Sequence, residues 1–285
     1  MNDREAAASR ARAWHHARQE LICDVAETWA HGVILRATRY PDYWDFNLVR
    51  VDEEPAMDVQ ELITIADEAL ADASHRRIDF DAAAAADPLR PGFEAIGWHA
   101  LRLLYMRHEA MAPDVAGMAV EEVPYEAAGA LRTAWHAEDF PGQDPGEYPG
   151  QAREVALSRG ARVFAVIEAG EPIAFAQIEH VAGSAEITHV YVRSDRRGNG
   201  IGTAITRASI DAAGEVDDLW ISADDEDRPK ELYARLGFRP AWLSMELTRL
   251  PWAARRGRRF RRVSAARRMR SGSPRCASAA GGRRP

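Results

Sequence analysis

The chain has 285 residues, a length typical of two modest domains rather than one large one. Hydrophobic residues make up 46% and aromatic residues 8% of it, which excludes a wholly disordered or fibrous protein. The formal net charge of −7 is unevenly spread. Positions 251–285 hold twelve arginines and no acidic residue, so 25 of the 37 basic and all 44 acidic side chains lie before them, for a charge of −19.

The two cysteines, Cys23 and Cys276, lie far apart and have no Cys or His partners at metal-ligand spacing. This pattern excludes a disulfide scaffold or a Cys-rich zinc site, and we expect no metal. The N-terminus alternates charge with alanine, and no stretch approaches the roughly 18 apolar residues that span a bilayer. These observations predict a cytoplasmic protein with no membrane contact. One lysine among many arginines and alanines is typical of a GC-rich bacterial genome.

The first predicted unit runs from residue 1 to 113. Apolar residues at helical spacing, Trp14 to Trp29, predict a helix over 12–30. An apolar segment over 32–40 and a β-rich strand over 44–53 follow. Asp58 is placed to cap a helix over 59–73. A short strand over 75–81 and an apolar segment over 97–106 complete this unit.

The second predicted unit covers residues 114–250. A strand over 119–124 and a helix over 125–138 precede a Pro- and Gly-rich loop over 139–151 and a further helix that stops at Gly160. Three strands over 162–192 are joined by tight turns at 168–171 and 182–184. A helix over 201–214, a strand over 218–223, a short helix over 228–237 and a strand over 241–247 follow. Helices between the later strands predict an α/β fold with a mixed central sheet flanked by helices.

The two units resemble each other at an offset of about 140 residues. Phe93–Trp98 (FEAIGW) corresponds to Tyr233–Phe238 (YARLGF), and Ile65 and Leu70 correspond to Ile205 and Ile210. The agreement in order and spacing over some 40 residues favours a degenerate internal duplication over chance similarity.

The stretch RRGNGIG, Arg196–Gly202, carries the strongest chemical signal. It follows an apolar strand and opens an amphipathic helix. Glycines let the backbone take positive φ and approach a ligand closely, while the free amides and the dipole of a helix N-terminus favour an anion such as a pyrophosphate. Arg196 and Arg197 add positive charge. The glycine spacing excludes GxGxxG, and the P-loop ending GK[ST] is absent.

Arg197-x-x-Gly200-x-Gly202 after a strand resembles the [RQ]xxGx[GA] acyl-CoA loop of the GCN5-related N-acetyltransferases (GNAT superfamily), and LYARLGF, with Tyr233, resembles their second signature. The resemblance covers about residues 120–247. It implies a GNAT fold, here in two tandem GNAT-like units, and acetyl-CoA as co-substrate. The cofactor-binding residues that it implies are Val190, Tyr191, Val192, Arg196, Arg197, Gly198, Asn199, Gly200, Ile201 and Gly202. The backbone at 190–192 would pair with the pantetheine where two strands splay.

Transfer to an amine needs a polarised carbonyl, a proton for the thiolate and a neutral nucleophile. A backbone amide at the splay can stabilise the oxyanion, and the hydroxyl of Tyr233, which the resemblance places near the sulfur, can act as general acid. Glu186, at the start of the strand that enters the loop, is our candidate base. His189, on the same strand with opposite facing, and Glu179 and His180 on the preceding strand are the alternatives.

Two departures from the family pattern stand out. An asparagine common after the penultimate strand is replaced by the acidic run 224–227, which removes one contact to the pantetheine region. The first unit has EEPAMDVQEL in place of the glycine loop, and Phe93 in place of Tyr233. A phenylalanine has no proton to give and acidic side chains repel phosphates, so this unit is interpreted as a decayed copy retained for structure or substrate capture.

The acceptor region is expected in the segment 133–151. It holds Trp135, His136, Glu138, Asp139, Phe140, Asp144 and Tyr148. Acidic and aromatic residues suit a cationic amine, on a small molecule or a protein, although an ordinary solvated acidic loop is the alternative. The basic segment 251–285 lacks periodicity and is expected to be disordered, with a nucleic-acid-binding arm as the alternative.

The function predicted is therefore that of a cytoplasmic acetyl-CoA-dependent N-acetyltransferase, a monomer or homodimer. The alternative is a non-catalytic acyl-CoA-binding or sensing module, associated with nucleic acid through its basic segment.

Overall fold

The structure, a computed structural model, describes residues 3–110 and 117–251. The boundary predicted at residue 113 and all but the first residue of the basic segment lie outside these ranges. None of the described helices has the length and apolar character needed to cross a bilayer.

Eleven strands are described. They are β1 (Val25–Trp29), β2 (Gly32–Arg36), β3 (Leu48–Val51), β4 (Arg76–Phe80), β5 (His99–His108), β6 (Glu121–Val123), β7 (Arg162–Glu168), β8 (Glu171–Val181), β9 (Ser184–Val192), β10 (Leu219–Asp224) and β11 (Phe238–Arg249). The α-helices are α1 (Asp3–Glu20), α2 (Val59–Ala69), α3 (Ala83–Ala86), α4 (Arg90–Ala95), α5 (Gly129–Asp139), α6 (Tyr148–Ser158), α7 (Ile201–Ala213) and α8 (Pro229–Arg235). Short 3-10 turns are η1 (Trp44–Phe46), η2 (Tyr125–Ala128) and η3 (Ser194–Arg196).

The helix predicted over 12–30 is wrong in its second half. Helix α1 ends at Glu20, and Val25–Trp29 is strand β1. Branched and aromatic residues such as Val25, Thr28 and Trp29 favour a strand, and β2 supplies the partner directly after a tight turn. The hairpins predicted over 162–192 are confirmed. Their two-residue turns place both an alanine and a glycine at positive φ (52° and 82° at 169–170; 50° and 80° at 182–183), the conformation of a type I′ turn.

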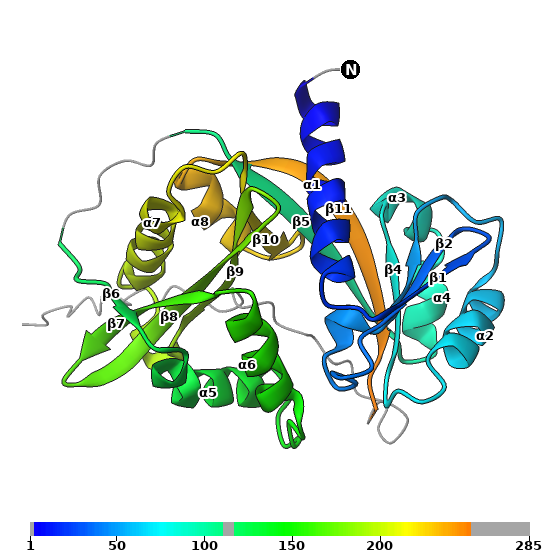
Figure 1. The fold of residues 1–285 in the computed structure, drawn as a ribbon, viewed down its shortest axis with the longest axis horizontal. Helices are drawn as coiled ribbons and strands as arrows, with labels where there is room; N and C mark the ends of the chain where they lie inside the picture. Colours follow the sequence, from blue (N-terminus) through cyan, green and yellow to red (C-terminus); the bar gives the residue numbers. More distant parts are fainter. Residues whose placement is uncertain (1–2, 111–116, 252–285) are drawn as a thin grey trace, which may run out of the picture.

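All eleven strands form one sheet, in the order β1-β2-β3-β4-β11-β5-β10-β9-β8-β7-β6. Only β3–β4 and β9–β10 pair in parallel; the other neighbours are antiparallel. The architecture is the predicted α/β fold with a mixed sheet flanked by helices. Figure 1 shows two lobes on either side of α1, joined by the long strands β5 and β11.

The order of elements repeats along the chain. The series β1-β2-β3-α2-β4-α4-β5 returns as β7-β8-β9-α7-β10-α8-β11. The matched sequences FEAIGW and YARLGF occupy the same place in both series, the short helix and the turn into the last strand. Gly97 and Gly237 hold that turn with φ of 87° and 95°. The positive φ explains why both series keep glycine there.

The last strand of each half pairs with a strand of the other half. Strand β5 of the first half pairs with β10, and β11 of the second half pairs with β4. The cores follow the exchange, because Leu104 and Met106 of β5 pack in the core under α7 and α8, whereas Met245 and Leu247 of β11 pack with α2 and α4. Helix α1 covers the junction, where Trp14 stacks on Trp220 at 6.4 Å between ring centroids. The two halves therefore share one continuous sheet.

Candidate active site

The parallel strands β9 and β10 separate partway along their length. They pair only over Ala185–Ile187 and Leu219–Ile221, although β9 runs on to Val192 and β10 to Asp224. Beyond Ile187, β9 has no strand on its β10 side within the described residues. An unpaired strand edge inside a sheet presents backbone donors and acceptors to an extended ligand.

A bulge in β9 determines on which face of the sheet its polar side chains lie. The β8 residues Phe175, Gln177 and Glu179 alternate, so they share one face of the sheet, and their partners on β9 are Tyr191, His189 and Glu186. The extra residue, Thr188, breaks the simple alternation between His189 and Glu186. The prediction that His189 faces away from Glu186 is therefore wrong: both side chains lie on the same face.

The glycine loop leads from β9 into α7. Gly198 and Gly200 have φ of 87° and 78°, and Gly200 is the N-cap residue, with no side chain to cap the helix. The amides of residues 198–203 have no acceptor in the described part of the chain. An added Cβ at Gly198 or Gly200 would contact nothing within 4 Å, so the left-handed backbone rather than packing explains glycine here. Free amides at the start of a 13-residue helix fit the pyrophosphate of a CoA thioester.

The two arginines of the loop hold it in place. Arg197 donates to the carbonyl of Val192 at 2.7 Å and to Glu138 at 2.7 Å. Arg196 is paired with Glu168 at 2.7 Å and with Asp195 at 3.1 Å. Both cations predicted beside the cradle thus have carboxylate partners, and the cradle itself consists of backbone amides.

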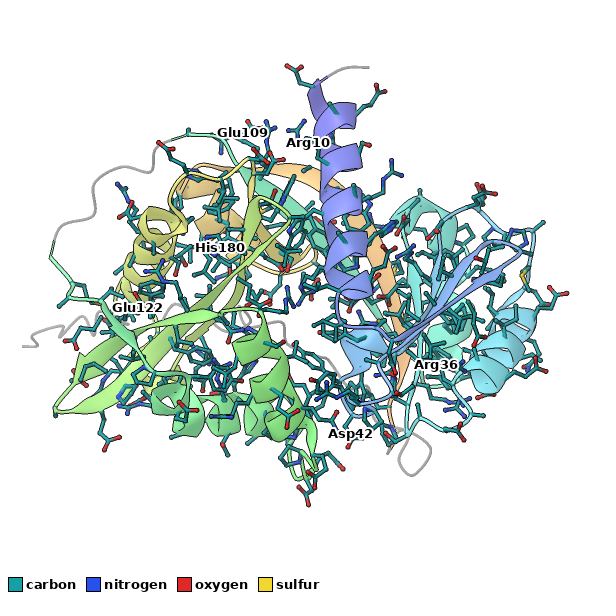
Figure 2. All side chains as sticks on the ribbon, in the orientation of Figure 1. Arg10, Arg36, Asp42, Glu109, Glu122 and His180 are labelled. Atoms are coloured by element: carbon teal, nitrogen blue, oxygen red, sulfur yellow. The ribbon has the colours of Figure 1, made fainter. Side chains whose placement is uncertain are left out.

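A cavity of about 770 Å³ lies on the face that carries Glu186 and His189. Both halves of the chain line it. Its walls include His15, Arg18, Asp42, Tyr43, Trp44, Arg77, Tyr105, Tyr125, Arg132, Trp135, His136, Phe140, Tyr148, Glu186, His189, Ser222, Tyr233 and Glu246. Figure 2 shows Asp42 at the side of the first lobe that faces α6, and the Asp42 amide donates to Gln151 of α6 at 2.9 Å.

Glu186 is buried and faces the cavity. Its carboxylate lies 3.6 Å from Nε of Arg18 and accepts from the Ser222 hydroxyl at 3.4 Å, while its Oε2 has no hydrogen-bond partner. Burial raises the pKa of Glu186, and the charge of Arg18 opposes that rise. A carboxylate with a raised pKa and an oxygen that accepts no hydrogen bond can accept a proton from an incoming group.

Tyr233 lies on α8 and lines the same cavity. Its ring packs against Phe238 with 6.3 Å between centroids, and only 3% of the residue is exposed. Burial raises the pKa of its hydroxyl, which keeps the proton in place near neutral pH. No partner for the hydroxyl is found among the described residues. Val190 and Val192 pack toward α7 and α8, and Tyr191 packs on the opposite face and donates to Glu138 at 2.9 Å.

Of the three alternative bases, His189 lines the cavity, and the other two do not. Glu179 is buried behind the cavity in an ion pair with Arg159 at 2.6 Å. His180, labelled in Figure 2, lies within 3.1 Å of the Ala213 carbonyl at the end of α7. It is not among the residues that line the cavity. Of the expected acceptor residues, six line the cavity: Trp135, His136, Asp139, Phe140, Asp144 and Tyr148. The exception is Glu138, which binds Arg197 and Tyr191 instead.

The acidic run at 224–227 contacts the first half. Glu226 pairs with Arg90 at 2.5 Å, and Asp225 lies 3.7 Å from Arg102. Away from the cavity, His16, Asp52 and Asp81 bring possible ligand atoms within 4.8 Å of one another, although Arg50 already binds Asp52 at 2.7 Å.

Sequence reasoning missed the cavity wall that the first half supplies. Arg18 reaches Glu186 across 168 positions, and Tyr105, hydrogen-bonded to His15 at 3.0 Å, comes from the exchanged strand β5. It also missed Arg132, although this residue lies in the helix predicted to border the acceptor. No local motif marks these residues, because their roles depend on how distant elements pack.

Residues 159–240 match the family model described as the acetyltransferase (GNAT) domain. This segment contains the splay, the glycine loop and Tyr233. None of the curated proteins matches the chain. Among solved structures, a conserved protein of unknown function from Staphylococcus epidermidis has a TM-score of 0.59 at 15% identity, covering 78% of this chain and 92% of that one. A GCN5-related N-acetyltransferase from Kribbella flavida has a TM-score of 0.54 at 17% identity, covering 85% of this chain and 95% of that one.

These structural matches show a shared fold, a mixed sheet with helices on its faces. The domain match confirms the resemblance seen in the two signatures. Within residues 159–240, the chain is similar to the acetyltransferase (GNAT) domain.

Proposed function

We propose that this protein transfers an acetyl group from acetyl-CoA to a primary amine. The observation that carries the proposal is one juxtaposition: the edge of β9 freed by the splay lies between the glycine cradle of α7 and the cavity that holds Glu186 and Tyr233. A donor and an acceptor could meet there from opposite sides.

The donor side is formed by backbone. The amides of residues 198–203 would bind the pyrophosphate, and the edge at 190–192 would pair with the pantetheine. When bound, acetyl-CoA supplies a thioester, whose carbonyl carbon accepts the amine and whose thiolate leaves. A β9 amide near Thr188 can polarise the carbonyl oxygen, since a fixed backbone donor needs no reorganisation.

The acceptor side is formed by side chains. Glu186 is our proposed base, taking a proton from the ammonium directly or through water, and Tyr233 is our proposed acid, donating its phenolic proton to the leaving sulfur. The raised pKa of each supports its role, because Glu186 takes up a proton more readily than an exposed glutamate and Tyr233 stays protonated. Three acidic side chains that line the cavity, Asp42, Asp139 and Asp144, suit a cationic acceptor.

We assign residues 114–250 to the acetyltransferase domain and residues 1–113 to a degenerate copy that lines the acceptor cavity without binding a donor. In the first half, the loop equivalent to the cradle holds Asp52, Glu53 and Glu54 and lacks glycine. Each chain would therefore bind one acetyl-CoA. The free, half-buried thiol of Cys23 agrees with the reducing cytoplasm as its compartment.

Thiol release tests this function. The full chain is incubated with acetyl-CoA and a panel of primary amines, and free CoA is measured with a thiol reagent. We expect amine-dependent release and, by calorimetry, one acetyl-CoA site per chain. Donor binding with no release for any amine would support the acyl-CoA-sensing alternative, and two donor sites per chain would overturn the division between the halves.

A further inference from the structure

One cation in the cavity differs from the others. Arg132 of α5 lines the cavity, and its guanidinium lies between two aromatic rings, 4.0 Å from the centroid of Tyr125 and 4.5 Å from that of Phe175. A guanidinium held between two rings has little freedom to turn, so its donors keep a fixed direction.

The other arginines that line the cavity have carboxylate partners. Arg18 lies beside Glu186, Arg77 pairs with Asp45, Asp79 and Glu246, and Arg153 pairs with Glu126 at 2.6 Å. Arg132 has none within the part of the chain that the structure describes. Its one hydrogen bond runs from Nη2 to the side-chain oxygen of Gln177 at 2.7 Å, and its buried Nε has no partner.

The groups around Arg132 position its guanidinium without neutralising its charge. The amide of Gln177 donates to Glu179 at 2.6 Å, and Glu179 is itself paired with Arg159. Glu126 and Glu138, the two carboxylates nearest in sequence, are paired with Arg153 and Arg197. Burial lowers the pKa of Arg132, which shows that the fold gives its charge little compensation. Arg132 therefore presents a half-buried, oriented guanidinium with no carboxylate partner among the described residues, and such a group binds a carboxylate well.

Arg132 lies close to the splay, where the transfer reaction would take place. Gln177 on β8 is the register partner of His189 on β9, next to the bulge at Thr188. Neighbouring strands lie about 4.8 Å apart, so the guanidinium is roughly one strand away from the splay. An acceptor whose carboxylate lies a few bonds from its amine can therefore reach both places.

We propose that Arg132 binds the carboxylate of the acceptor, which makes the substrate an amino acid or a closely related amino carboxylate with an apolar body. The aromatic walls formed by Tyr43, Trp135, Phe140 and Tyr148 receive that body. This inference rests on the proposed function and narrows its substrate class.

The test compares acceptors that differ only in the carboxylate. L-phenylalanine and L-tryptophan are each compared with the corresponding carboxamide and decarboxylated amine, in wild-type protein and in Arg132→Met. We expect Arg132→Met to lower kcat/KM for the acids by about 10- to 150-fold, the range for a lost hydrogen bond to a charged group, with a change of less than threefold for the amides and amines.

Arg153→Met is the matched control, because Arg153 lines the same cavity but is exposed and already paired with Glu126. It should leave the preference for acids unchanged. Arg132→Lys keeps a charge between the rings and loses the fork of donors, so its loss should be intermediate. This second variant keeps the test decisive if circular dichroism shows that Arg132→Met is unfolded.

A binding measurement separates this inference from the function on which it rests. L-phenylalanine binding is followed by ligand-observed NMR without acetyl-CoA. Binding to wild type that Arg132→Met abolishes supports the carboxylate site even if no amine is ever acetylated, in which case the proposed function fails alone. Acetylation or binding that does not distinguish acids from amides, or equal effects of the Arg132 and Arg153 variants, overturns the inference and leaves the function standing.

Discussion

The two parallel crossovers of this sheet, β3-α2-β4 and β9-α7-β10, are built alike and end differently. In the first, β3 stays paired to its last residue, because Val51 lies opposite Phe80 and its carbonyl accepts from the Asp81 amide. In the second, β9 outruns its pairing with β10 by five residues, from Thr188 to Val192. The end of β3 is therefore paired, whereas the edge of β9 beyond Ile187 is free to pair with a ligand.

The N-termini of the two crossover helices also differ: a side chain caps α2, whereas no side chain caps α7. Asp58 caps α2, and its carboxylate accepts from the amides of Gln60 and Glu61 at 2.8 and 2.9 Å while Glu61 reaches back to the Asp58 amide. At α7 the corresponding residue is Gly200, which offers no side chain. A helix that caps itself leaves fewer free amides for a phosphate than a helix opened by glycine. The residue at the helix cap and the pairing of the preceding strand together distinguish the two crossovers.

Closing the open N-terminus of α7 should have the greatest effect of all, because it blocks the donor site. Gly200→Glu puts a negative side chain on a backbone with φ of 78° beside the cradle, so acetyl-CoA binding by calorimetry should be lost, with circular dichroism unchanged. The matched change in the other crossover, Asp58→Ala, should cost about 1 kcal/mol of stability and leave donor affinity intact. Undiminished affinity in a folded Gly200→Glu protein would show that the cradle is not the donor site.

The next effect concerns the aromatic pair Tyr233 and Phe93, which occupy equivalent short helices. Tyr233→Phe should slow acetyl transfer by roughly 10²–10⁴-fold, the scale of general-acid catalysis, with donor affinity little changed. Phe93 is fully buried against Trp98, 5.0 Å away between ring centroids, and has no cradle nearby. Adding Phe93→Tyr to the Tyr233→Phe protein should therefore restore no activity. Full turnover by Tyr233→Phe would exclude the proposed acid.

The smallest effect is a change in pH dependence. Glu186 acts as a base only when ionised, and burial raises its pKa above the usual value of about 4.3, so wild-type kcat/KM should fall as the pH drops through that raised pKa. Glu186→Gln should lose this acid limb and about 10² in rate, the lower end for general-base catalysis. An acid limb that persists in the variant would assign it to another group.

Structural features that are determined by neighbouring residues could be predicted from the sequence. The glycine loop, the hairpin turns and the short helix of Tyr233 each depend on a few consecutive residues, and all were found. The facing of His189 was not, because a bulge at Thr188 leaves no mark on an alternating pattern. Arg18 and Arg132 were missed because burial and partners, which depend on distant elements, give them their character. The repeat of about 140 residues showed the two halves but not the exchange of their last strands.

That exchange has a consequence for how the protein is made. Strand β4 gains its inner neighbour only when β11 exists, and the roughly 160 residues between them take about 8–32 s to synthesise at 5–20 residues per second. During that interval the nascent first half exposes the unpaired edges of β4 and β5, which are open to mispairing with other chains. The first half therefore cannot finish folding on the ribosome ahead of the second, and both become native together.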